Sequence, residues 1–248
     1  MDFVVTERHE EIFLVRLNRP RQRNALNRQS LIELGAVIDS ALNDDAIRAV
    51  VLTGSEQAFS AGQDLKEPES SDYIELINAT FDRLETLPKP TVAAIDGWCI
   101  AGGLELALCC DIRVCADSVK IGDWHAKINS IGGAGATVRL VRTIGLPRAK
   151  ELIFSGAALD AKTARDIGLV SHVYESGALI GSAIAFAKLL CVGSAITVSC
   201  AKKSMNAAAD LPLDQAMALS LECQSAVRKA HSEYTDRFAA RNEQSQKS

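Results

Sequence analysis

The sequence predicts an α/β protein, with a core of strands and helices followed by a helical C-terminal region. In the first half, short segments rich in β-branched and aromatic residues alternate with segments whose apolar residues recur at the helical period of 3.6. From about Gly133 onward, helical patterns dominate. The chain has 248 residues, of which 48% are hydrophobic and 23% charged. This balance allows a substantial core and excludes disordered and fibrous classes.

The first elements follow from local patterns. Residues 3–8 and 12–17 are rich in β-branched and aromatic residues and are separated by three residues, which predicts a hairpin of two strands. Asn27 can cap a helix whose apolar residues from Leu31 to Leu42 follow the helical period. Residues 47–53 form an apolar run that predicts a buried strand.

The remaining elements are predicted in the same way. Residues 54–71 contain glycine, proline and serine and predict a long irregular segment before a helix over 72–85. Strands are predicted at 91–95, 111–115, 119–121 and 169–174, and helices at 136–144, 147–155, 161–167, 178–190, 195–209 and 212–231. We therefore expect an α/β core over residues 1–190 and a helical region over 191–248.

Charge and cysteine content exclude several function classes. Lys and Arg number 27 and Asp and Glu 31, for a net charge of −4, and no basic run is present, so we expect no nucleic-acid partner. No basic N-terminal region with an apolar stretch and no membrane-length apolar run is found, so we expect a cytoplasmic protein without a membrane partner. The seven cysteines include no C-x-x-C pair, which favours free thiols and predicts no metal site.

Glu105 is the first candidate for chemistry, because its neighbours from Leu104 to Leu108 are otherwise apolar. A buried, unpaired carboxylate costs several kcal/mol. Glu105 must therefore be paired, protonated or directed into a cavity. The structural interpretation is a salt bridge to an arginine such as Arg113. The functional one is a general acid or base whose pKa is raised by burial.

Two glycine-containing turns can present free backbone N–H groups. Residues 58–65 follow one predicted strand, and residues 100–103 begin a helix after the next. Donors at a helix N-terminus favour an anion or a developing oxyanion. One glycine turn is more often explained by packing, but two turns with Glu105 three positions after Gly102 form a more specific pattern. The glycine-rich segment 132–135 superficially resembles a phosphate loop, but it lacks the Walker lysine.

Four segments together resemble the enoyl-CoA hydratase/isomerase (crotonase) family in order and spacing, over nearly the whole chain. They are Asn24-Ala25-Leu26, the segment 58–65, the segment from Gly102 to Arg113, and the segment from Gly132 to Leu140. The resemblance implies a crotonase-like core of repeated ββα units. It also implies a helical C-terminal region that mediates trimerisation, and a homotrimer or a homohexamer built as a dimer of trimers.

The resemblance also implies which residues form the active site and contact coenzyme A. Two backbone N–H groups, at positions matching Ala61 and Gly102, would stabilise the enolate of an acyl-CoA thioester. Coenzyme A would enter as part of the substrate, with no other cofactor. The implied CoA contacts are Arg23, Asn24, Ala25, Leu26, Gln63, Asp64, Leu65 and, from an imperfect C-terminal motif, Phe238 and Arg241.

His125 departs from the family pattern. Hydratases of the family use two glutamates; Glu105 matches the first, and alignment of residues 119–127 places His125 at the second. A histidine, whose ordinary pKa is about 6.5, can serve as acid or base. It can also be a structural residue. Asp123 lies two positions earlier and would point the same way in an extended strand, where it could orient His125.

The sequence therefore predicts an acyl-CoA enzyme with Glu105 and His125 as catalytic residues and 2-enoyl-CoA hydration as the default reaction. Hydrolytic carbon–carbon cleavage of a β-keto or cyclic diketone acyl-CoA is the alternative that His125 favours, and double-bond isomerisation is the third. An alternative of a different class is a catalytically silent acyl-CoA binding protein, which would need neither Glu105 nor His125.

Overall fold

The computed structural model describes residues 2–68 and 70–245, with side chains described as far as residue 232. The chain divides into two compact units, Met1–Leu190 and Cys191–Ser248. All the strands of the described residues lie in the first unit.

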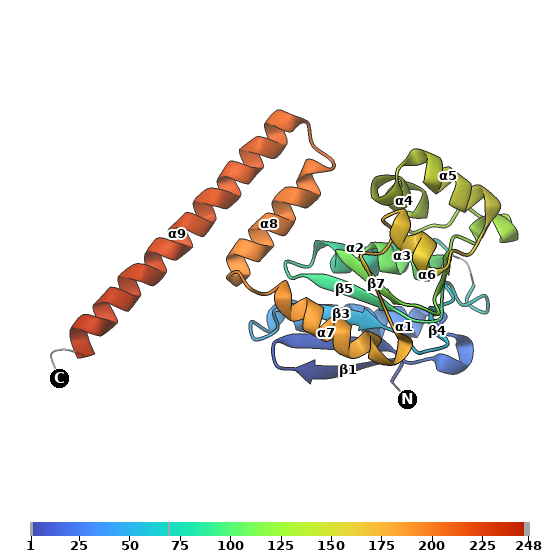
Figure 1. Cartoon of the computed structure of the whole chain (residues 1–248), viewed down its shortest axis with the longest axis horizontal. Coiled ribbons are helices and arrows are strands. Elements are labelled where there is room, and N and C mark those ends of the chain that lie inside the picture. Colours follow the sequence, from blue (N-terminus) through green and yellow to red (C-terminus); the bar gives the residue numbers. More distant parts are fainter. Residues whose placement is uncertain (1, 69, 246–248) are drawn as a thin grey trace. The chain divides into compact units, whose positions relative to one another are not determined.

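Two sheets form the framework of the first unit (Figure 1). The larger has the strand order β1-β2-β3-β5-β7-β9, in which β1 and β2 are antiparallel and every other neighbouring pair is parallel. Its strands are β1 (Val4–His9), β2 (Ile12–Leu17), β3 (Ala49–Thr53), β5 (Thr91–Ile95), β7 (Ile112–Ala116) and β9 (His172–Tyr174). The smaller sheet is parallel and consists of β4 (Ala58–Ser60), β6 (Trp98–Ile100) and β8 (Lys120–Gly122).

The two sheets are connected by a repeated pattern. Each of β3, β5 and β7 is followed by a short strand of the smaller sheet, and the first two repeats then continue into α2 (Ser71–Thr86) and α3 (Gly102–Leu108). Because β4, β6 and β8 run parallel, their carboxyl ends meet at one edge of the sheet. The segments that follow, beginning at Ala61, Ala101 and Asp123, are thereby brought together, as at the carboxyl ends of other parallel strands.

The other helices pack around these sheets. Helix α7 contacts β2, β3, β5 and β7, and α1 packs on α2, β1 and β2. The bounds are α1 (Arg28–Asn43), α4 (Ala136–Ile144), α5 (Leu146–Ser155), α6 (Ala161–Asp166) and α7 (Leu179–Leu189), with 3-10 turns η1 (Pro20–Gln22), η2 (His125–Ile128) and η3 (Ser176–Ala178). Strands β3 and β5 are buried along their whole length, as expected for parallel strands covered on both faces.

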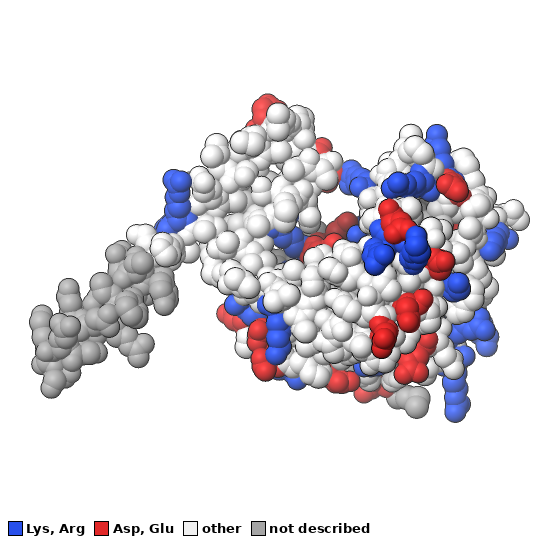
Figure 2. All heavy atoms as spheres, viewed as in Figure 1, with Lys and Arg blue, Asp and Glu red and all other residues white. Residues whose placement is uncertain are grey.

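The second unit is a pair of helices, α8 (Ala195–Ala208) and α9 (Leu213–Ser245), which pack against each other. Within the described residues, no helix has both the length and the hydropathy needed to cross a bilayer. On the visible face of the first unit, basic and acidic side chains are interspersed rather than gathered by sign (Figure 2).

The fold confirms the predicted α/β class, the repeated ββα core and the helical C-terminal region. The opening hairpin and the Asn27 cap are present; the Asn27 side chain accepts from the Ser30 N–H. The prediction of an irregular segment over 54–71 was wrong at β4, and β6 was not predicted. Both strands have three residues, too few to show a period. Helix α9 also runs beyond the predicted end at 231.

Candidate active site

A cavity of about 1070 Å³ opens at the shared carboxyl edge of β4, β6 and β8. One face of α2 lines it together with Gln22, Ala25, Leu26, Ala61, residues 63–67, residues 100–102, Glu105, Trp124, His125 and residues 128–134. The α2 face contributes Ile74, Ile77 and Phe81, so that part of the wall is apolar. Trp124 lines the cavity and packs edge-on against Trp98, with ring centroids 5.2 Å apart.

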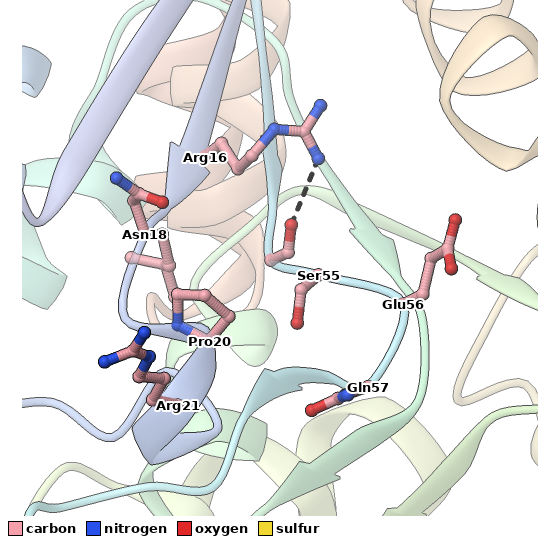
Figure 3. A pocket seen from close by; sticks show the side chains of 9 residues that line it. Arg16, Asn18, Pro20, Arg21, Ser55, Glu56 and Gln57 are labelled. Carbon is pink, nitrogen blue, oxygen red and sulfur yellow. Dashed lines mark hydrogen bonds between the residues drawn. The ribbon is translucent and has the colours of Figure 1, made fainter.

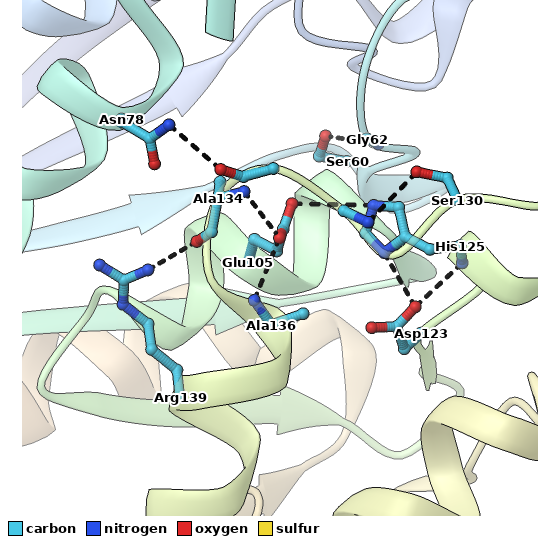
Figure 4. Close-up of polar contacts among 12 residues, drawn as sticks. Ser60, Gly62, Asn78, Glu105, Asp123, His125, Ser130, Ala134, Ala136 and Arg139 are labelled. Atoms are coloured by element: carbon cyan, nitrogen blue, oxygen red, sulfur yellow. Dashed lines mark hydrogen bonds and ion pairs between the residues drawn. The ribbon is translucent and has the colours of Figure 1, made fainter. Parts of the chain in front are cut away.

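Glu105 lies on α3 and is only 2% exposed. Its Oε1 atom accepts hydrogen bonds from the backbone N–H groups of Ala134 at 3.0 Å and Ala136 at 3.1 Å (Figure 4). Burial raises the pKa of Glu105, and this outweighs the lowering by those two donors and by His125. The suggested ion pair with Arg113 was wrong, since that guanidinium donates to the carbonyls of Leu169 and Cys110.

His125 is the first residue of η2 and lines the cavity beside Glu105. Its Nε2 lies 3.8 Å from Glu105 Oε2, and its Nδ1 lies 2.9 Å from Asp123 Oδ1 (Figure 4). The same Asp123 oxygen accepts the backbone N–H of His125 at 2.9 Å. Asp123 therefore orients the ring, but through a turn after β8 rather than through an extended strand.

Asp123 also determines the electrostatics of His125. Burial lowers the pKa of the imidazole, but the hydrogen bond to Asp123 and the charge of Glu105 raise the pKa more, so it lies above its ordinary value. With Asp123 as the acceptor, Nδ1 carries a proton, and Nε2 is the atom directed at Glu105. The arrangement can therefore take or give a proton at Nε2.

The predicted pair of free N–H groups needs one correction. The N–H of Ala61 donates to the Arg23 carbonyl at 2.9 Å and is not free. Residues 61–64 run as a ladder beside residues 23–26, in which Leu26 and Asp64 also donate across. Leu26 pairs with Gln63 in a parallel bridge, in which it bonds to the Gly62 carbonyl and the Asp64 N–H, the groups on either side of Gln63. The N–H of Gln63 therefore points away from that ladder.

Gln63 and Gly102 carry the two free N–H groups. Neither donates to any acceptor within the described part of the chain. Gly102 is the first residue of α3, whose initial N–H groups have no helical partner. The two amides are adjacent: a Cβ built on Gly102 would lie 3.3 Å from Gln63 N. Gly62, at φ +90°, permits this approach, since a Cβ there would lie 2.8 Å from Gly102 N.

Comparison with known proteins identifies the family. The model for the enoyl-CoA hydratase/isomerase family matches residues 7–245. The chain belongs to that family.

Relatives match over most of the chain. The short-chain-enoyl-CoA hydratase of Clostridium acetobutylicum is 35% identical over 226 residues, which cover 88% of this chain and 87% of that protein. A solved enoyl-CoA hydratase from Bacillus anthracis superposes with a TM-score of 0.89 at 32% identity, covering 96% of each chain. A solved putative enoyl-CoA hydratase from Thermobifida fusca, in complex with CoA, superposes with a TM-score of 0.86 at 25% identity, covering 94% and 95% of the two chains.

The residues predicted to contact CoA divide into two groups in this family member. Ala25, Leu26, Gln63, Asp64 and Leu65 line the cavity, but Arg23 and Asn24 do not. The Asn24 side chain is buried and holds the loop by accepting from the Arg19 N–H and donating to the Ala58 carbonyl. Asp64 also pairs with Arg19 at 2.8 Å.

Two further groups of residues are compared with the predicted site. The side chains of Phe238 and Arg241 lie outside the described residues. Gln22, Lys66 and Glu67 line the cavity although no motif singled them out. Their positions beside the matched segments were the available signal.

A second, shallower cavity of about 490 Å³ lies between residues 16–21 and 54–57 (Figure 3). Arg16 there donates to the Gly54 carbonyl at 3.1 Å, and Arg21 and Glu56 are exposed. Within the described residues, no set of three or more His, Cys, Asp or Glu side chains is arranged to hold a metal ion. The Glu105–His125 cavity is therefore the stronger candidate for an active site.

Proposed function

We propose that this enzyme adds water across the 2,3 double bond of an enoyl-CoA thioester. The observation that carries the proposal is the pair of proton-transfer groups, Glu105 Oε2 and His125 Nε2, 3.8 Å apart on one cavity wall. The free amides of Gln63 and Gly102 lie in the same cavity. The hydratase relatives and the CoA complex of a structural relative support the same substrate class.

The two amides would bind the thioester carbonyl oxygen. When water attacks C3, negative charge moves onto that oxygen, and fixed N–H donors stabilise the enolate at no cost of reorganisation. One such donor is worth roughly 2.7–4 kcal/mol of transition-state free energy. The apolar side chains of Ile74, Ile77 and Phe81 would contact the acyl chain.

Glu105 and His125 would move the protons. Glu105, ionised, takes a proton from the attacking water, and the hydroxyl oxygen bonds to C3. The π electrons form the enolate, and C2 then takes the Nε2 proton of the His125 imidazolium. Reprotonation of His125 by Glu105, through the 3.8 Å separation or a bridging water, restores the starting state. Asp123 stabilises the imidazolium that this cycle requires.

A second candidate is favoured by the Asp123–His125 contact. A carboxylate that accepts from Nδ1 can also support a neutral imidazole as a base at Nε2. Such a base would activate water against the ketone of a β-keto or cyclic diketone acyl-CoA. The carbon–carbon bond would then break, so that the former ketone carbon becomes a carboxylate and the thioester fragment leaves as the enolate that the two amides stabilise. The α-carbon of that enolate would take the proton that His125 removed from water.

Product analysis in ¹⁸O-labelled water tests the proposal, with wild type and Glu105→Gln incubated separately with 2-enoyl-CoA and cyclic β-keto-CoA thioesters. A labelled hydroxyl at C3 that depends on Glu105 is expected. Label in a new carboxylate, with inert enoyl substrates, would replace hydration by carbon–carbon hydrolysis. A shifted double bond without label would indicate isomerisation, and thioester binding with no turnover of any substrate would indicate a binding protein.

We also propose that the C-terminal unit assembles the chain into a homotrimer, or a hexamer of two trimers. Leu213, Met217 and Leu221 are four residues apart on α9, so they share one face, and they are 79%, 54% and 58% exposed. An apolar helical face of this kind favours a protein partner. Light scattering of the purified protein distinguishes monomer, trimer and hexamer.

A further inference from the structure

Three consecutive peptide groups surround the Glu105 carboxylate. Ala134 N–H and Ala136 N–H donate to its Oε1 atom. The carbonyl of Gly133 belongs to the same peptide group as the Ala134 N–H, and it accepts from Asn78 Nδ2 at 3.1 Å (Figure 4). The carbonyl of the next peptide, at Ala134, accepts from Arg139 Nη1 at 2.6 Å. Hydrogen bonds from Asn78 and Arg139 to these carbonyls therefore hold the loop that donates to Glu105.

Arg139 is in turn fixed by α2. Its Nε and Nη2 atoms donate to the two carboxylate oxygens of Glu85 at 3.1 and 2.5 Å, which is the bidentate geometry that restricts a guanidinium most. The Arg139 side chain is only 16% exposed. Asn78 and Glu85 are seven residues apart on α2, two helical turns along one face. One helix therefore anchors the loop at two points.

We propose that Asn78 and the Arg139–Glu85 pair are positioning residues for the Glu105 carboxylate. The inference rests on the proposed role of Glu105 as the base. A peptide group whose carbonyl accepts a hydrogen bond becomes a stronger donor at its N–H, so Asn78 strengthens and aims the bond from Ala134 to Glu105. Arg139 bonds to the Ala134 carbonyl and so fixes the orientation of the next peptide group. That orientation keeps the N–H of Ala136 directed at Glu105. Without these contacts, the loop and the base lose their alignment with substrate.

This role predicts a specific kinetic signature. Asn78→Leu removes the donor to Gly133 while keeping a similar shape, and we expect kcat to fall about 3- to 10-fold, the effect of one neutral hydrogen bond. Arg139→Met removes charge-assisted bonds, and we expect a loss of about 10- to 100-fold. Arg139→Lys should recover part of it, since lysine can still donate to Ala134. KM should stay near wild type, because the thioester contacts lie elsewhere in the cavity.

The test has a substrate-free readout. Titration of Glu105 by ¹³C NMR, assigned by its absence in Glu105→Gln, reports the pKa of that carboxyl in each variant. Loss of aligned N–H donors should raise the pKa in Asn78→Leu and in Arg139→Lys. The other ionisable groups near Glu105 are His125, Asp123 and Cys109, and neither variant replaces any of them. Arg83→Gln is the matched control, since Arg83 lies on α2 but pairs with Asp39 at 3.2 Å, and should behave as wild type.

Three outcomes would overturn the inference. They are a Glu105 titration identical to wild type in both variants, a fall in kcat explained by thermal unfolding alone, and a rise in KM at constant kcat. Because the titration needs no substrate, it separates this inference from the proposed function. An enzyme inactive on enoyl-CoA, whose Glu105 titration still shifts as expected, would refute the function but keep the positioning role.

Discussion

A single carboxylate oxygen of Asp123 holds His125 at two points, accepting both its backbone N–H and its ring Nδ1 at 2.9 Å. Asp123 is 1% exposed and stands immediately after β8. The ring therefore has little rotational freedom, and its Nε2 is directed at Glu105. Position and protonation of His125 are determined by the same contact.

Asp123→Asn tests that contact. The amide keeps the shape but removes the charge that stabilises the imidazolium, so the pKa of His125 should fall. The high-pH limb of the hydration rate, where the imidazolium is lost, should move to lower pH. We expect kcat to fall about 10- to 150-fold, the effect of one hydrogen bond to a charged group. A pH–rate profile measures both; an unmoved high-pH limb would contradict the acid role of His125.

Glu105→Gln should lower activity and raise stability. We expect kcat to fall roughly 10²- to 10⁴-fold, as for loss of a general base. The pKa of Glu105 is raised in the folded protein, so its ionisation opposes folding as pH rises above the pKa of the unfolded chain. The neutral amide removes that cost.

Thermal unfolding between pH 4 and 8 checks the stability effect of Glu105→Gln. The gain in Tm should be near zero at low pH, where both states are protonated, and should grow as pH rises through the folded pKa. Each kcal/mol corresponds to about 2–4 °C for a chain of this size. A pH-independent difference in Tm would mean that burial does not govern this carboxyl.

Gly132→Ala should impair chemistry beyond its effect on folding. Gly132 has φ +75°, and a Cβ there would lie 2.7 Å from His125 Cε1 and 2.8 Å from Glu105 Oε1. A displacement of about 1 Å at such groups can cost roughly 10²-fold in rate. Gly168→Ala is the matched control, with φ +81° and no atom within 4 Å of the added Cβ. Both should lose about 1–2 kcal/mol of stability, but only Gly132→Ala should lose kcat.

The amide pair is tested by two neighbouring substitutions. Gln63→Ala keeps the backbone N–H, so kcat/KM should stay within about 2-fold of wild type. Gly62→Ala adds a Cβ 2.8 Å from Gly102 N, which should displace that donor and lower kcat/KM about 10²-fold. Steady-state kinetics with one enoyl-CoA measure both. A large loss in Gln63→Ala would show that the side chain, rather than the amide, acts.

Much of the fold could be predicted because its main elements are long enough to show a period. The hairpin strands, β3 and β5, and helices α1 and α2 each span five or more residues with a clear apolar pattern. The three-residue strands β4 and β6 could not be predicted in this way. They exist because parallel neighbours supply their hydrogen bonds, as in the pairing of Trp98 with Lys120.

The sequence by itself determined the α/β class and singled out Glu105, because residue type and local period are carried by adjacent residues. His125 was singled out by the resemblance to the family, which aligns it with the second glutamate of the hydratases. Tertiary structure decided what surrounds them. The free amide is that of Gln63 rather than Ala61, since pairing with residues 23–26 determines which N–H groups point outward. Glu105 is held by Ala134 and Ala136 rather than by an arginine. The direction of a backbone N–H in an irregular loop depends on hydrogen bonds to segments tens of residues away, which no local pattern encodes.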